Sequence, residues 1–154
     1  MILVTLGTQK QQFNRLLDYI EASNIKDKII VQAGHTKYYS KKMKIFDFIS
    51  YDEMNEYINK ADLIITHAGT GSIITPLKMG KKVVACPRLK EYDEHVDDHQ
   101  TQLVDIFYEE GYILKLNEEN DLNELLKNIK NFKPKKYISN SSNFIKKLKD
   151  EMEK

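Results

Sequence analysis

The sequence predicts an α/β fold, in which a single doubly wound parallel sheet is covered by helices on both faces. Two observations support this prediction. Short apolar runs rich in β-branched residues alternate with segments of helical spacing, and glycine or proline follows most of the apolar runs. A chain of 154 residues has the length of one domain. We therefore expect one domain over residues 1–154, closed by a terminal helix over residues 143–154.

Six apolar runs have the length of strands. They are residues 2–6, 29–33, 45–49, 62–66, 82–86 and 112–116. Gly7, Gly34, Gly69 and Pro87 lie just past four of these runs. Parallel strands joined by right-handed crossovers end at the same edge of a sheet, and ligands bind at that edge. We therefore expect the four turns, and any ligand, to lie along one edge.

Apolar residues at helical spacing predict six helices between and after these strands. They are expected at residues 11–22, in a short segment capped by Asp52, at 72–79, at 99–110, in a segment capped by Asp121, and at 143–154. The segment between residues 88 and 98 is dense in charge and has no periodicity, so it is expected to be an irregular loop.

The stretch ADLIITHAGTGSIITPLKMG, residues 61–80, organises the prediction. It reads as a buried strand, a turn from His67 to Ser72 with two glycines, and a helix that stops at Gly80. The first turn of a helix leaves backbone N–H groups unpaired and carries partial positive charge, and glycine lets an anion approach the backbone closely. We interpret this turn as the binding site for the diphosphate of a nucleotide. The alternative is that it only reverses the chain.

Composition excludes several classes of function. The formal net charge is +1, so no strong field favours nucleic acid. No apolar run is long enough to span a bilayer, and the first residues lack the pattern of a signal peptide, so we expect a soluble, cytoplasmic protein. Cys86 is the one cysteine and lies in an apolar run, where we expect a small core residue.

Two motifs resemble a known family. THAGTGSIITPLKMGKKVVACPR, followed by EHVDDHQTQLVDIFYEEGYIL, is similar to the C-terminal half of the family 28 glycosyltransferases, and MILVTLGTQKQQFNRLLDYI is similar to the start of the same half. The resemblance covers residues 1–116. It is strongest to the separate catalytic, donor-binding subunits of bacterial capsule and exopolysaccharide glycosyltransferases. Their eukaryotic relative is the small subunit of the N-acetylglucosaminyltransferase that makes chitobiosyl-diphosphodolichol.

The resemblance implies a single Rossmann-like domain, equivalent to the C-terminal half of a GT-B enzyme, that binds a nucleotide-sugar. It implies inverting transfer of a hexose from a UDP-sugar (UDP-galactose, UDP-glucose or UDP-N-acetylglucosamine) to a polyprenyl-diphosphate-linked sugar. A membrane-anchored partner would supply the acceptor-binding half and hold the chain at the inner face of the membrane. Neither a metal nor another cofactor is implied, and no nucleic acid is expected.

The resemblance also assigns roles to individual residues. Those that match the diphosphate-binding turns are His67, Gly69, Thr70, Gly71, Ser72, Gly7 and Thr8. Those that match the region contacting the donor sugar are Glu94, Asp98, His99 and Gln100, and the candidates for the catalytic base are Glu94 and His95. The residues alone leave alternatives open. These are helix capping by Thr70 and Ser72, an orienting role for His67, and a solvated loop around Glu94.

Two positions depart from the family pattern: Asp93, which replaces what is often a glycine, and Thr75. Many relatives hold the ribose hydroxyls with an acidic residue six positions after the equivalent of Gly69, where this chain has Thr75. The departure at Thr75 supports a second hypothesis, a non-catalytic nucleotide-binding subunit that regulates or stabilises a glycosyltransferase complex. A domain of the flavodoxin or response-regulator type fits less well, because Gly7-Thr8-Gln9 offers neither an acidic cluster nor an aromatic residue for a flavin.

Overall fold

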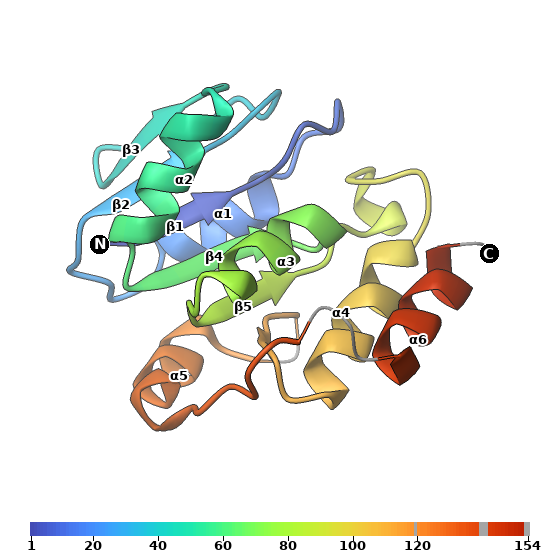
Figure 1. Ribbon diagram of the computed structural model, residues 1–154. Helices are drawn as coiled ribbons and strands as arrows, with labels where there is room; N and C mark the ends of the chain where they lie inside the picture. Colours follow the sequence, from blue (N-terminus) through green and yellow to red (C-terminus); the bar gives the residue numbers. More distant parts are fainter. Residues whose placement is uncertain (119, 139–141, 153–154) are drawn as a thin grey trace.

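A sheet of six parallel strands forms the centre of the molecule (Figure 1). The computed structural model describes residues 1–118, 120–138 and 142–152. The strands are β1 (Ile2–Thr5), β2 (Ile29–Gln32), β3 (Met43–Phe46), β4 (Leu63–His67), β5 (Val83–Cys86) and β6 (Leu114–Lys115). Their order is β3-β2-β1-β4-β5-β6, and every neighbouring pair is parallel. The chain winds outward in both directions from the β1–β4 pair, so the doubly wound α/β fold is confirmed.

Helices cover both faces of this sheet. They are α1 (Asn14–Glu21), α2 (Tyr51–Lys60), α3 (Thr70–Lys78), α4 (His99–Glu109), α5 (Leu122–Lys127) and α6 (Ser142–Met152), with the 3-10 turns η1 (Lys90–Tyr92) and η2 (Ile129–Asn131). Leu16 of α1 and Leu122 of α5 enter the core on one face. Ile58 of α2, Ile73 of α3 and Phe107 of α4 enter the core on the other face. Figure 1 shows α2 and α3 in front of the strands and α1 behind them.

The central strands are mostly apolar because both of their faces are buried. All four residues of β1 and of β5 are buried. Successive side chains point to opposite faces, so Val4 joins one core and Leu3 the other. Cys86 lies wholly buried in β5, and burial raises the pKa of its thiol to about 12. The expectation of a core cysteine is confirmed, and this thiol is unreactive at neutral pH.

The strand order places the turn after β1 beside the turn after β4. Thr5 and Thr66 lie side by side on these two strands, and the Thr5 hydroxyl donates to the Thr66 hydroxyl at 2.6 Å. Gly7 and Gly69 follow within three residues of them. A crevice between two neighbouring strands whose connections run in opposite directions is the usual ligand site of a doubly wound sheet. The fold therefore brings the two glycine turns singled out from the sequence to that position.

The N-cap of helix α2 lies two residues before the expected cap. Ser50 is the N-cap, and its hydroxyl accepts a hydrogen bond from the Glu53 N–H at 3.2 Å. Asp52, expected as the cap, lies in the first turn, so that prediction was wrong; its carboxylate instead complements the positive end of the helix dipole. The cap expected at Asp121 is confirmed, because its carboxylate accepts from the Asn123 N–H at 3.0 Å.

Three other boundaries differ from the expectations. Strand β3 spans Met43–Phe46 rather than residues 45–49, because Met43 pairs with Ile29 at the start of β2. Strand β6 has only two residues of the expected run. The terminal helix, expected at residues 143–154, runs from Ser142 to Met152, and residues 153–154 lie outside the described part.

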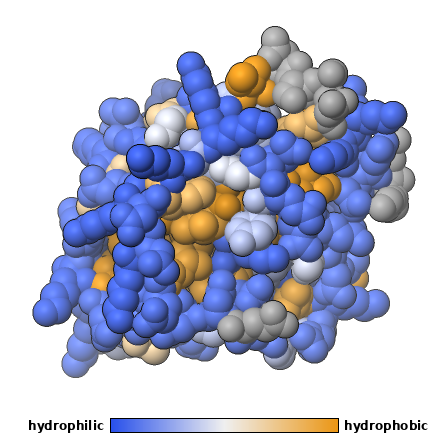
Figure 2. All heavy atoms as spheres, turned by 90° about the horizontal axis from the view of Figure 1, so that it is seen from below, coloured by the Kyte–Doolittle hydropathy of each residue, from blue (hydrophilic) through white to orange (hydrophobic). Residues whose placement is uncertain are grey.

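The surface is mostly hydrophilic on the face seen from below, with apolar atoms visible in a hollow near its middle (Figure 2). Along the described residues, no helix combines the length and the apolar composition needed to cross a bilayer.

Candidate functional site

The start of α3 offers three uncommitted backbone donors. Gly69 is the N-cap residue, it has no side chain to cap the helix, and its carbonyl accepts the first bond, from Ile73 N–H at 3.1 Å. Among the described residues, nothing accepts from the N–H groups of Thr70, Gly71 or Ser72. Unpaired donors at the positive end of a helix attract an anion. The helix begins two residues earlier than expected, which adds Thr70 and Gly71 to its first turn.

Three glycines in these turns have different surroundings and therefore different roles. A Cβ atom added to Gly7 or to Gly69 would lie 2.6 Å from Cε1 of His67, which is far inside van der Waals contact. A Cβ atom on Gly71 would meet nothing within 4 Å. Gly7 and Gly69 therefore make room for the His67 ring between two turns, and Gly71 leaves space open in front of the helix. The sequence argument gave Gly69 and Gly71 the same role, close approach of a ligand, and the geometry separates them.

Gln100, expected to contact a sugar, lies buried beneath the turn. Its Oε1 atom accepts two backbone hydrogen bonds, from Ala68 N–H at 3.1 Å and from Arg88 N–H at 3.0 Å. These two donors fix the orientation of the amide, so its Nε2 atom faces Nδ1 of His67 at 3.3 Å. Gln100 is 5% exposed, so its position is that of a support for the site rather than of a ligand contact.

This orientation determines the tautomer of His67. The Nδ1 atom faces an amide NH₂ group and must accept, so the ring proton is on Nε2. The Nε2 atom lies 3.0 Å from Oγ of Ser72 and therefore donates to it. Burial, with the charges of Arg88 and His95, lowers the pKa of His67 to about 3, so the ring is neutral at physiological pH.

The network leaves the Ser72 hydroxyl with a free proton. Its oxygen accepts from His67, and its hydrogen has no acceptor among the described residues. The hydroxyl lies in the first turn of α3, beside the unpaired N–H groups. It can therefore donate to the same anion as they do, which gives a site of backbone and hydroxyl donors without any charged side chain. Capping by Ser72, the alternative considered from the sequence, is not what its side chain does here.

Glu94 is committed to an ion pair. Arg15 donates from Nη2 to Oε1 at 2.9 Å and from Nε to Oε2 at 3.1 Å, and the Leu89 N–H adds a third bond to Oε1 at 3.0 Å. The Glu94 side chain is 3% exposed. A carboxylate with both oxygens occupied by a permanent cation is a poor base and a poor sugar ligand. Glu94 therefore has a structural role: it joins the loop at Leu89 to Arg15 of α1.

Arg88 was not singled out from the sequence, yet it joins three segments around the site. The Arg88 guanidinium is buried and donates to the carbonyls of Leu6 at 2.6 Å, Gln11 at 2.9 Å and Glu94 at 3.0 Å. Its carbon also lies 4.9 Å from the centre of the Phe13 ring. From the sequence, an arginine inside a charged loop is expected to be exposed to solvent. Its buried position becomes evident only from the carbonyl groups that it binds, which come from distant positions in the chain.

The remaining predicted residues lie along the same edge. Asp97 accepts from His99 N–H at 2.9 Å and lies 3.1 Å from Nδ1 of His95. Asp98, a predicted sugar ligand, accepts from Lys90 N–H at 2.9 Å and so helps to fold the loop. Thr8 is exposed in the first turn. Roles for Thr8, His95, Asp98 and His99 in ligand binding stay predictions.

Fold and site together define a class of protein. A doubly wound parallel sheet with an unpaired helix N-terminus at the β1–β4 crevice is the arrangement in which many α/β domains bind phosphate groups. The chain belongs to the glycosyltransferase family 28 C-terminal domain, which it matches over residues 1–154. The family expected from the resemblance is therefore confirmed, as is the likeness to the C-terminal domain of GT-B enzymes.

Relatives with curated names are subunits of one kind of enzyme. The chain is 38% identical over 73 residues to the UDP-N-acetylglucosamine transferase subunit ALG13 of Saccharomyces cerevisiae, which is 47% of this chain and 34% of the relative. The human protein of the same name is 30% identical over 125 residues, which is 73% of this chain and 10% of the relative. The chain thus matches about a third of the yeast relative. These names do not support the narrower expectation of a capsule or exopolysaccharide enzyme.

Solved structures share the fold. The solution structure of ALG13 aligns with a TM-score of 0.57 at 21% identity, over 94% of this chain and 92% of the other. The glycosyltransferase SnogD from Streptomyces nogalater aligns with a TM-score of 0.58 at 15% identity, over 99% of this chain and 39% of the other. At such identities the likeness establishes the fold alone. The aligned part of SnogD therefore has the same fold as this chain.

Proposed function

We propose that this chain is the donor-binding subunit of a glycosyltransferase and that it binds a UDP-sugar through the start of α3. The observation that supports the proposal most directly is the group of four donors there: the N–H groups of Thr70, Gly71 and Ser72 and the Ser72 hydroxyl. A diphosphate carries its charge on several oxygens, which these donors match. Among the UDP-sugars expected from the sequence, UDP-N-acetylglucosamine is the first to test, because the curated relatives are named for it.

The same donors suit the chemistry of sugar transfer. An acceptor hydroxyl attacks the anomeric carbon, the bond from that carbon to the diphosphate oxygen breaks, and UDP leaves with the bonding electrons. Negative charge then grows on the diphosphate, where fixed donors at a helix start stabilise it. Neutral His67 does not supply a proton in this scheme. It aims the Ser72 hydroxyl.

The base that accepts the proton of the acceptor hydroxyl is not assigned within this chain. Glu94 is held by Arg15, and His95 lies against Asp97. We propose that the partner subunit contributes the base together with the acceptor site. The proposed acceptor is a sugar linked to a lipid diphosphate, and the proposed location is the cytoplasmic face of a membrane, reached through that partner.

Calorimetry with UDP, UDP-N-acetylglucosamine, UDP-glucose and UDP-galactose tests the binding step. The wild-type chain should bind UDP, and Ser72→Ala should weaken binding about tenfold, the worth of one charge-assisted hydrogen bond. Ser50→Ala is a matched control, because it removes a serine hydroxyl at the start of α2, away from the site. Equal UDP affinity of wild type and Ser72→Ala would contradict the proposed site.

A second candidate is a regulatory subunit that binds a nucleotide without taking part in the transfer. It is supported by Thr75, which stands where many relatives place the acid that holds ribose. The two candidates differ in the reconstituted complex of this chain with its partner. If the chain is the donor subunit, Ser72→Ala lowers the rate of transfer while the complex still forms. If the chain is regulatory, transfer by the partner continues with the Ser72→Ala chain at the wild-type rate.

A further inference from the structure

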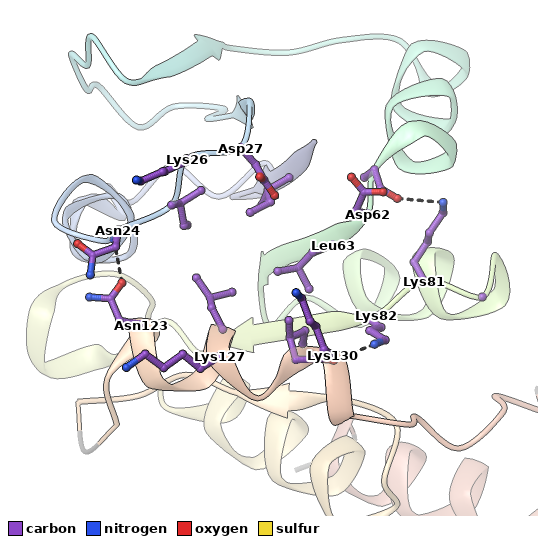
Figure 3. Close-up of a pocket in the computed structure, with 16 residues that line it drawn as sticks. Asn24, Lys26, Asp27, Asp62, Leu63, Lys81, Lys82, Asn123, Lys127 and Lys130 are labelled. Carbon is purple, nitrogen blue, oxygen red and sulfur yellow. Dashed lines mark hydrogen bonds between the residues drawn. The ribbon is translucent and has the colours of Figure 1, made fainter.

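A cavity lies at the edge of the sheet opposite the first turn of α3. Its volume is about 790 Å³, within the range of small-molecule sites (Figure 3). Ile2 and Leu63, the first residues of β1 and β4, line it, as does Lys82 just before β5. A strand of four residues is about 13 Å long, so the cavity is separate from the diphosphate site. The proposed function does not use it.

The outer wall of the cavity is fastened at both ends. The wall consists of α5 and η2, which cross in front of the strand starts. At one end, Asn123 Oδ1 accepts from the Asn24 N–H at 2.8 Å. At the other end, the Lys82 ammonium donates to the Ile129 carbonyl at 2.8 Å. These two bonds tie the wall to the loop before β2 and to the residue before β5.

The inside of the cavity is apolar and its rim is cationic. The apolar lining is formed by Ile2, Ile25, Leu63, Leu126 and Ile129. The rim carries five lysines and two aspartates, and they are Lys26, Lys81, Lys82, Lys127, Lys130, Asp27 and Asp62. Asp62 is already paired with the N-terminal ammonium at 2.6 Å. The rim therefore presents an excess of positive charge.

Structural roles account for only some of these lysines. Lys81 donates to the Asn59 and Ala61 carbonyls at the end of α2, and Lys127 pairs with Glu124 on its own helix. Lys26 and Lys130 have no hydrogen-bond or ion-pair partner within the part of the chain that the structure describes. In Figure 3, Lys130 points from η2 toward Leu63, into the cavity. Both side chains are exposed, so their ammonium groups are accessible to a ligand at the rim.

We propose that this cavity binds an amphipathic anion, with an alkyl chain on the apolar lining and a phosphate or carboxylate against Lys130 and Lys26. The apolar part supplies burial, and the two ammonium groups select a negatively charged head. The ligand can come from two sources, a free acyl or alkyl anion or a phospholipid in a membrane, and both share this chemistry.

The test uses dodecyl phosphate below its micelle concentration and ¹⁵N-labelled full-length chain. In ¹H–¹⁵N correlation spectra, dodecyl phosphate should shift the amides of residues 24–27 and 123–130. UDP should shift residues 69–72 instead, so failure of one site is distinguished from failure of the other. Methyl phosphate and dodecyl maltoside test the two halves of the ligand separately, and each should bind at least about tenfold more weakly than dodecyl phosphate.

A double variant tests the lysines. Lys26→Gln with Lys130→Gln should weaken dodecyl phosphate binding at least about tenfold. The control is Lys41→Gln with Lys44→Gln, which removes the same charge from exposed positions at β3 and should change the affinity by less than about twofold. Thermal unfolding of both double variants checks that they are folded.

Two arms distinguish the sources. Binding to phosphatidylglycerol vesicles, lost in Lys26→Gln/Lys130→Gln, identifies a membrane lipid. Binding of dodecyl phosphate without vesicle binding identifies a free anion. The proposal is overturned if dodecyl phosphate shifts no amide of residues 24–27 or 123–130, if methyl phosphate binds equally well, or if both double variants lose affinity to the same extent.

Discussion

Gln100 holds the ring of His67 in one tautomer, with its amide Nε2 atom 3.3 Å from the ring Nδ1 atom. The orientation of that amide is set by two backbone N–H groups, those of Ala68 and Arg88, that donate to its oxygen. A side chain at the start of α4 thus decides in which direction the hydroxyl of Ser72, in the first turn of α3, can donate.

The relationship predicts that Gln100→Glu separates folding from ligand binding. The carboxylate still accepts from Ala68 and Arg88, so the unfolding free energy should fall by less than in a variant that removes both acceptors. A carboxylate beside Nδ1 draws the ring proton to that nitrogen, and Nε2 then becomes an acceptor that takes the proton of Ser72. UDP affinity should fall about tenfold, to the level of Ser72→Ala. Long-range ¹H–¹⁵N spectra of the ring report the tautomer, and calorimetry reports the affinity.

Gln100→Met is the companion variant. It has a similar volume but leaves two buried N–H groups without an acceptor, so it should lower the unfolding free energy by about 2–4 kcal/mol. If Gln100 instead binds the sugar directly, Gln100→Met leaves stability unchanged and affects only the affinity for UDP-sugars relative to UDP.

Because His67 is buried as a neutral ring, the stability of the chain should depend on pH. Its pKa is about 3 in the folded chain, against about 6.5 in an unfolded one. Between these values the unfolded chain binds one more proton, so stability falls as the pH drops from 6.5 toward 3 and is unaffected by His67 above that window. Relative to His67→Gln, the wild type should lose about 1.4 kcal/mol per pH unit in this window. Urea unfolding at several pH values measures the two slopes, and parallel slopes would show that His67 is not buried as a neutral ring.

The glycines predict opposite effects of the same substitution. Gly69→Ala drives a methyl group into the His67 ring and should cost about 2 kcal/mol or more of unfolding free energy. Gly71→Ala meets empty space and gains helix propensity, so it should stabilise the chain by about 0.5 kcal/mol while hindering the ligand. Thermal unfolding and UDP calorimetry on both variants give the comparison. Stabilisation by both variants would contradict the packing described for His67.

Substitution of Glu94 should lower the stability of the chain rather than abolish catalysis. Glu94→Ala leaves Arg15, with a side chain 14% exposed, without its carboxylate partner, and should lower the unfolding free energy by about 3 kcal/mol. Glu94→Gln keeps the shape and one acceptor, so it should cost less and retain most sugar transfer in the reconstituted complex. A folded, stable Glu94→Gln chain without transfer activity would instead identify Glu94 as a base.

The order of strands and helices was predictable because each element carries its own pattern. Strands such as β1 and β4 are buried on both faces, and their mostly apolar composition reflects this burial. The glycine turn before α3 was also recognisable, because glycines just before a helix mark a start at which an anion can approach the backbone. Boundaries were less accurate. Ser50 and Asp52 are both good cap residues, and their types alone do not decide between them.

The supports of the site were not predictable from the sequence. Arg15 and Glu94 are 79 residues apart, and Gln100 reaches His67 across 33 residues. Such pairs depend on which turns the sheet brings together. Charge and polarity in the 88–98 loop were therefore interpreted as ligand contacts. In the structure, Glu94 is buried against Arg15, and the neighbouring Arg88 and Gln100 are buried with backbone groups as partners.

Arg88 has a consequence for how a second subunit would associate. One guanidinium pins the end of β1, the approach to α1 and the loop before α4 through three carbonyls. These segments cannot shift independently without leaving a buried cation short of acceptors. An incoming protein would therefore meet a preformed rim, and its association rate should be set by diffusion and orientation, with no slow ordering step on this side.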